Sequence, residues 1–119
     1  MNLDDAIKAH AEWKLKLRSA IARKEKIDAA TLGRDDCCPL GKWLHGEARS
    51  KFNALGSYKD CLSHHAGFHA AAGKVALLVN AQRYAEAEQQ LGSGTAYATA
   101  SGATAASIIR LKKDVALAA

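Results

Sequence analysis

Apolar residues recur at helical spacing in three long segments of the chain. In the first segment, residues 3–27, they fall at intervals of four and six and predict one buried face of an amphipathic helix: Leu3, Ile7, Trp13, Leu17 and Ile21. His10 lies three residues after Ile7 and three before Trp13, on the same face. We therefore expect the His10 side chain to point into the core.

The second long segment, residues 58–82, has the same periodicity but includes two histidines in its apolar stripe. The stripe consists of Tyr58, Leu62, His65, His69, Ala72, Ala76 and Val79. Side chains four residues apart stack on one face of a helix, so His65 and His69 are predicted to lie together on the core side. His64 points to the side of this stripe and is expected at the surface.

The last segment, residues 84–117, has apolar positions at Ala87, Leu91, Ala98, Ile108, Ile109, Leu111 and Val115. Its middle is rich in small residues, and each glycine there costs about 1 kcal/mol relative to alanine in a helix. We nevertheless predict a helix that continues through Gly92–Gly94, because a break would leave three helices with an uncovered face.

The connector between the first two long segments contains a compact motif, Cys38-Pro39-Leu40-Gly41-Lys42-Trp43. Residues 28–36 before it are predicted to form a loop, and residues 47–53 after it a polar stretch. Proline is favoured at the first position of a helix, so Pro39 predicts a short helix that begins directly after Cys38. At that capping position the helix dipole and free amides favour a thiolate. Gly41 allows close backbone packing, and Trp43 is expected to pack the short helix onto the bundle.

These elements predict an all-α fold: an up-and-down antiparallel four-helix bundle, with a short extra helix that carries the cysteine. The length of 119 residues suits a single domain over residues 1–119. At 1.5 Å per residue, His10 lies about 25 Å from the end of the first helix, whereas His65 lies about 10 Å into the second. The two histidines meet only if the connector climbs back along the bundle.

The hydropathy pattern indicates in which compartment the protein is expected. The chain has no run of eighteen apolar residues, and its N-terminus is acidic where a signal peptide would be basic. We expect no membrane contact and a cytoplasmic location, where thiols stay reduced and the three cysteines are not a disulfide framework. A domain excised from a larger membrane receptor would show the same pattern.

The net charge of +5 raises the question of nucleic-acid binding. Basic residues do cluster in the first predicted helix: Lys14, Lys16, Arg18, Arg23, Lys24 and Lys26. However, Glu12 and Glu25 lie among them, and no group of aromatic residues beside them offers a surface for base stacking. The cluster indicates a solvated helix face and no nucleic-acid partner.

Two histidines supply half of a tetrahedral metal site, and His10 and Cys38 are the best candidates for the other half. Three imidazoles and one thiolate suit Zn²⁺, which accepts mixed nitrogen and sulfur donors. Four protein ligands leave no open position for a catalytic water, so we expect no enzyme activity. The Cys38 thiolate is the most reactive atom of such a site and a target for strong oxidants.

Several neighbouring residues are candidates for further roles. Glu12, Asp35 and Asp36 are near enough in sequence to accept an imidazole hydrogen bond. Cys61, one turn before His65, is more simply a small core residue than a ligand or resolving thiol. Cys37 is interpreted as incidental, because a disulfide to the adjacent Cys38 would be strained.

Two alternatives remain open at this point. The first is a metal-free helical interaction bundle with buried neutral histidines. The second is a di-iron bundle protein, which needs bridging carboxylates on its core faces. Asp and Glu largely avoid the apolar stripes here, so the second alternative is weaker.

The motifs His10-Ala11-Glu12-Trp13, Cys38-Pro39-Leu40-Gly41-Lys42-Trp43-Leu44 and His65 with His69 resemble the chemoreceptor zinc-binding (CZB) domain of bacteria. The resemblance covers residues 3–115 and implies a dimerising four-helix bundle that holds zinc through His10, Cys38, His65 and His69. Members are attached to chemoreceptors and diguanylate cyclases, and they regulate that output in response to zinc or to oxidants such as hypochlorous acid. The resemblance therefore implies a homodimeric sensory domain for chemotaxis or related signal transduction, with redox sensing at Cys38. Because the chain lacks an output domain, that domain would be supplied by a longer protein or a separate chain.

Overall fold

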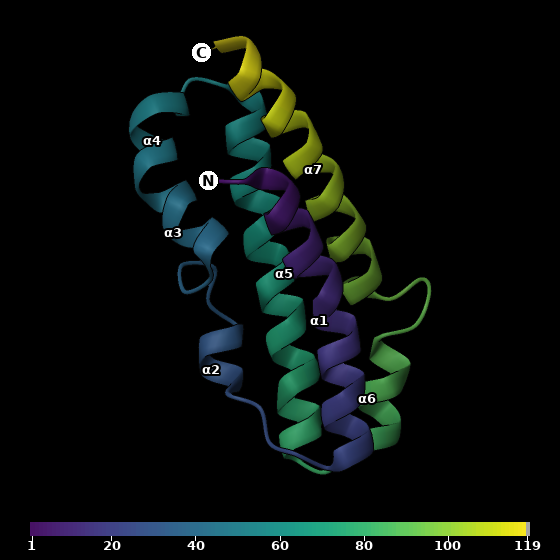
Figure 1. The fold of residues 1–119 in the computed structure, drawn as a ribbon. Helices are drawn as coiled ribbons and strands as arrows, with labels where there is room; N and C mark the ends of the chain where they lie inside the picture. The colour runs from purple at the N-terminus through teal and green to yellow at the C-terminus, as the bar shows by residue number, and fades with distance from the viewer. Residues whose placement is uncertain (119) are drawn as a thin grey trace.

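A computed structural model describes residues 1–118, and every regular element in that range is a helix. The helices are α1 (Leu3–Arg23), α2 (Ala29–Leu32), α3 (Pro39–His45), α4 (Glu47–Phe52), α5 (Gly56–Asn80), α6 (Tyr84–Gln90) and α7 (Ala96–Ala118). The three long helices α1, α5 and α7 run side by side, with the α2 to α4 segment along the opposite side of α5 from α7 (Figure 1).

The chain passes along the bundle four times in alternating directions, which confirms the predicted all-α bundle. In Figure 1, α1 descends, the α2 to α4 segment climbs back, α5 descends, and α6 with α7 climbs again. His10 and His65 could meet only if the connector between α1 and α5 ran back along the bundle, and the α2 to α4 segment does so. The second pass consists of three short helices and the fourth of a short helix, α6, followed by the long α7. Helices α2 and α4 occupy stretches where a loop and a polar patch were expected.

Helix α1 ends four residues earlier than the periodicity suggested. Lys24 adopts a left-handed conformation (φ 55°), and its amide bonds back to the last turn, which terminates the helix at Arg23. The segment after α1 is held in place by the side chain of Asn80 at the end of α5. Its side-chain oxygen accepts from the Ile27 amide at 2.8 Å, and its amide donates to the Ile27 carbonyl at 2.7 Å.

The prediction of a continuous last helix across Gly92–Gly94 is wrong. Helix α6 ends at Gln90 and α7 begins at Ala96, with Gly94 at a positive φ of 76° between them. The Thr95 hydroxyl donates to the Gly92 carbonyl at 2.8 Å and accepts from the Ala98 amide at 3.2 Å, which caps the new helix. The core stays covered because Leu91, inside the break, is fully buried.

The core consists of two clusters of buried residues, one in each half of the bundle. One cluster centres on Phe68 and Leu17, the other on Leu44 and Ile108. On α5, buried His65 lies between Cys61 of the second cluster and Phe68 of the first, and buried His69 directly follows Phe68. Within residues 1–118, no helix is both long and apolar enough to cross a membrane.

Candidate metal centre

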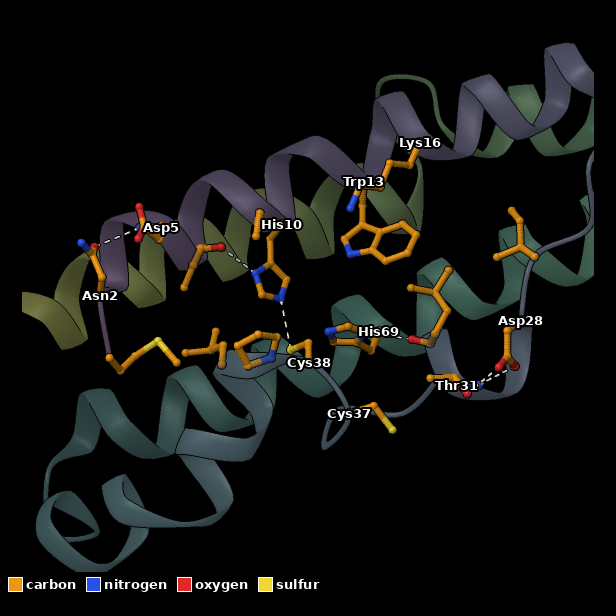
Figure 2. Close-up of a pocket in the computed structure, with 17 residues that line it drawn as sticks. Asn2, Asp5, His10, Trp13, Lys16, Asp28, Thr31, Cys37, Cys38 and His69 are labelled. Atoms are coloured by element: carbon orange, nitrogen blue, oxygen red, sulfur yellow. Dashed lines mark hydrogen bonds between the residues drawn. The ribbon is translucent and has the colours of Figure 1, made fainter.

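Four side chains from three elements converge at the junction of the two core clusters. His10 comes from α1, Cys38 directly precedes α3, and His65 and His69 lie one turn apart on α5. One potential ligand atom from each lies within 4.8 Å of all the others. We call these four residues the His/Cys cluster. Figure 2 shows the side chains of His10 and His69 directed toward Cys38.

The donor atoms have the spacing of a tetrahedral metal site. The Cys38 Sγ lies 3.2 Å from His65 Nε2 and 3.8 Å from His10 Nε2, and the two Nε2 atoms are 3.1 Å apart. Usual zinc bond lengths give tetrahedron edges of about 3.3 Å between nitrogens and about 3.6 Å between nitrogen and sulfur. These three spacings are close to the edges of a tetrahedral zinc site, and the His69 donor atom lies within 4.8 Å of the other three.

Backbone carbonyls set the tautomers of two of the histidines. His10 Nδ1 donates to the Ala6 carbonyl at 2.7 Å, and His69 Nδ1 donates to the Leu32 carbonyl at 2.8 Å. A carbonyl only accepts, so each Nδ1 carries the hydrogen and each Nε2 presents a lone pair. His69 Nε2 is buried and has no hydrogen-bond partner among residues 1–118. A lone pair buried in this way costs free energy, which a bound cation would recover.

Burial keeps the imidazoles neutral. It lowers the pKa of His10 and His69 below the usual value and lowers the pKa of His65 to about 3, with the neighbouring histidines adding to the effect. Neutral imidazole is the form that binds a metal, so at neutral pH these side chains need not lose a proton first.

The capping position favours a Cys38 thiolate as predicted, but it does not outweigh burial in the metal-free chain. Cys38 Sγ does accept a hydrogen bond from the Gly41 amide at 3.3 Å, as a cap residue should. Burial nevertheless outweighs this bond and raises the pKa of the Cys38 thiol. A bound cation would reverse the balance, because a coordinating thiol is deprotonated.

The position of Cys38 depends on close packing around α3. A Cβ atom on Gly41 would lie 1.7 Å from the Asp35 carbonyl oxygen, so only glycine fits there. Leu40 and Leu44 are fully buried and anchor the helix in the core. Trp43 is only partly buried and packs near Phe52 of α4, with ring centroids 6.2 Å apart.

A second glycine contact, which was not predicted, positions His69. A Cβ atom on Gly73 would lie 2.8 Å from the Cα of Gly33, so α2 and α5 touch backbone to backbone. Gly33 follows Leu32, whose carbonyl accepts from His69. The glycine spacing was the available signal: Gly73 lies one helical turn after His69.

The carboxylates that were candidates to accept hydrogen bonds from the cluster histidines have other partners or are exposed. Asp35 bonds His45 at 2.9 Å, and Asp36 pairs with Arg34 at 2.9 Å. Glu12 is exposed. Backbone carbonyls accept these imidazole hydrogen bonds instead. Residue types cannot show which carbonyls do so, because every residue has one.

The two other cysteines lie outside the cluster. Cys61 is fully buried in the second core cluster, where burial raises the pKa of its thiol to about 11. Cys37 is partly buried, with its sulfur 3.6 Å from an Asp36 carboxylate oxygen. Figure 2 shows the Cys37 side chain directed away from Cys38.

Comparison with models of protein families shows which family contains this site. Residues 10–76 match the family model described as the chemoreceptor zinc-binding domain. The matched range covers more than half of the chain and contains all four residues of the His/Cys cluster. This chain belongs to the chemoreceptor zinc-binding domain family. The resemblance inferred from the sequence motifs is therefore confirmed. Searches of curated proteins and of solved structures each returned no match.

For this CZB domain, the family and the His/Cys cluster together point to a bound metal, which the family description names as zinc. Zn²⁺ would be held by His10, Cys38, His65 and His69, and it would supply the charge that ionises the Cys38 thiol. The chain contributes the closed geometry, since all four donors come from the protein.

Lowering the pH should destabilise the metal-free protein. The unfolded chain binds protons at histidine from about pH 6.5 downward, whereas folded His65 stays neutral until about pH 3. The unfolded state thus binds more protons in this window, and stability is lost as the pH falls through it. We expect His65 alone to contribute a loss of about 2 kcal/mol between pH 7 and pH 5.

Urea unfolding of chelator-treated protein at pH 7, 6 and 5 measures this loss. The slope against pH should flatten in His65→Gln and persist in His64→Gln, which alters the exposed neighbour. Equal slopes in both variants would contradict the assignment to the buried imidazole.

Proposed function

We propose that this chain is a zinc-binding sensory and regulatory domain of bacterial signalling, of the kind that controls a chemoreceptor or a diguanylate cyclase. The observation that carries the proposal is the buried His/Cys cluster, with tetrahedral spacing and donors from α1, α5 and the start of α3. Zinc joins three separate elements there, so its gain or loss alters how they pack.

Cys38 is proposed as the residue that senses oxidants such as hypochlorous acid. Its three partners in the cluster are buried, whereas Cys38 itself is partly exposed. Oxidation of the sulfur removes a thiolate donor and weakens metal binding. Helix α3 begins at the next residue, so loss of this donor frees the N-terminal end of α3 to move.

The remaining parts of the proposal concern partners. We propose a homodimer that acts on an output domain in the same or another chain, in the cytoplasm and without enzyme activity of its own. A closed set of four protein donors supports the last point, because catalytic zinc keeps an open position. The di-iron alternative is not supported, because the described residues of the cluster include no carboxylate.

Zinc content per chain, measured by mass spectrometry on native protein, tests the proposal. We expect one zinc per wild-type chain, loss or loosening of it in Cys38→Ala, and loss after one equivalent of hypochlorous acid. Cys37→Ala is the matched control, because it removes the adjacent thiol without touching the cluster.

Unchanged zinc affinity in Cys38→Ala would remove Cys38 from the site and end the redox proposal. Wild-type protein without zinc after preparation in zinc-containing medium would favour the metal-free bundle. If zinc is bound through Cys38 but is retained after oxidation, the redox role is wrong and the proposed function is that of a zinc-responsive domain.

A further inference from the structure

An open groove of about 640 Å³ runs along α1 beside the His/Cys cluster. One wall is α1, and the other is formed by residues 27–40, which include α2 and the start of α3. His10, Cys38 and His69 lie along it, whereas His65 does not. Figure 2 shows it extending from Asn2 and Asp5 at one end to Trp13, Lys16 and Asp28 at the other. We call it the α1–α3 groove.

The groove has the size and lining of a small-molecule site. Its volume is in the range of about 300–1,000 Å³ that ligand pockets occupy. Its walls are mainly apolar: Ala6, Ala9, Trp13, Ile27, Leu32, Pro39 and Leu40. From Asp5 to Lys16 the groove follows α1 for eleven residues, or about 16 Å. An extended apolar chain, and not a compact ring system, fits such a shape.

Charge at the two ends sets the polarity of the ligand. Lys16 holds its ammonium 4.8 Å from the centroid of the Trp13 ring, and within residues 1–118 it forms no ion pair. Asp28 also lines this end, but its two oxygens bond the amide and hydroxyl of Thr31. Asp5 at the far end lies in the first turn of α1, where the helix dipole offsets its charge. Both carboxylates keep their charge, and Lys16 is the lining cation that forms no ion pair within residues 1–118, at the end of the groove opposite Asp5.

We propose that the α1–α3 groove binds a medium-chain amphipathic monocarboxylate, with the carboxylate at Lys16 and the chain lying past His69 and Cys38 toward Leu40. The bound chain covers the side of Cys38 that faces the groove. Occupancy then slows the reaction of this thiol with reagents from solution. This proposal is independent of the sensory role, because binding in the groove is measurable whether or not the domain signals.

Titration of the zinc-loaded protein with decanoate, followed by tryptophan fluorescence and by amide chemical shifts, tests the proposal. We expect saturable, sub-millimolar binding, with shifts confined to α1 and residues 27–40. Lys16→Met should weaken binding about fivefold, since it removes one partly exposed ion pair. Decyltrimethylammonium, with the same chain and the opposite charge, should bind more weakly than decanoate to wild type and gain from Lys16→Met.

Two further variants make the test specific. Ala9 is exposed and lines the groove, so Ala9→Trp fills the groove without burying a larger side chain in the core and should abolish binding. Lys74→Met is the matched control, because Lys74 lines a separate groove between α5 and α7 and should leave affinity unchanged. Saturating decanoate should also slow alkylation of Cys38 by iodoacetamide in chelator-treated protein at least threefold.

Equal decanoate affinity in wild type and Lys16→Met, or full binding in Ala9→Trp, would overturn the proposal. So would shifts that map to the Lys74 groove. If decanoate does not bind and Ala9→Trp instead lowers the sedimentation-derived mass, the α1–α3 groove holds a second copy of the chain, and the proposed ligand is wrong.

Discussion

Removing zinc from this CZB domain is expected to lower the free energy of unfolding by about 4 kcal/mol, relative to protein at a free zinc concentration 1,000 times the dissociation constant. The physical reason is that the native fold brings together four donors that the unfolded chain keeps apart, so metal affinity becomes folding stability. For a domain of this size the loss corresponds to a fall in Tm of roughly 15 °C. Calorimetry in zinc-buffered and chelator-containing solutions measures it.

A pair of adjacent histidines provides the control for this measurement. His65→Ala should abolish the zinc-dependent rise in Tm, because His65 Nε2 lies 3.1 Å and 3.2 Å from two other donor atoms. His64→Ala should keep the full rise, because His64 is exposed and outside the cluster. A Tm that does not respond to zinc in wild type would show that the cluster is not a metal site.

Gly41→Ala is expected to destabilise the protein by about 3 kcal/mol and to weaken zinc binding at least tenfold. The added Cβ would lie 1.7 Å from the Asp35 carbonyl oxygen and 2.7 Å from its carbon, which are backbone atoms that cannot swing aside. Relief requires α3 to move away from residues 35 and 36. Since Cys38 caps α3 and its sulfur bonds the Gly41 amide, the thiol moves with the helix.

Gly67→Ala is the matched substitution in an open position. Gly67 lies in the middle of α5 with no atom within 4 Å of the added Cβ, so alanine should stabilise the helix by about 0.5–1 kcal/mol. Urea unfolding and competition with a zinc indicator measure both quantities for the two variants. If Gly41→Ala binds zinc as tightly as Gly67→Ala, the position of α3 does not control the site.

The periodicity of the chain was sufficient to predict the bundle and the orientation of its histidines. His10, His65 and His69 fall on apolar stripes, and a side chain on such a stripe faces the core whatever the details of packing. Pro39 in the same way predicted where α3 begins, because proline favours the first position of a helix. The positions of His10 and His65 along their helices then required the connector to run back along the bundle, which it does.

Local sequence patterns gave the wrong expectation at two places. Gly94 at positive φ and the Thr95 cap end the last helix, although small residues alone were compatible with its continuation. The capping position of Cys38 suggested a thiolate, but desolvation depends on all the atoms packed around the sulfur, which a local pattern does not contain.

Residue type and spacing were enough to predict which side chains meet in the His/Cys cluster: one histidine on the apolar stripe of α1, two on that of α5, and a cysteine directly before α3. The way they are held depends on tertiary contacts. The Ala6 and Leu32 carbonyls that orient His10 and His69, and the Gly33–Gly73 contact that brings α2 close enough, are backbone features. Backbone groups are the same at every residue, so their selection depends on which segments the fold brings together.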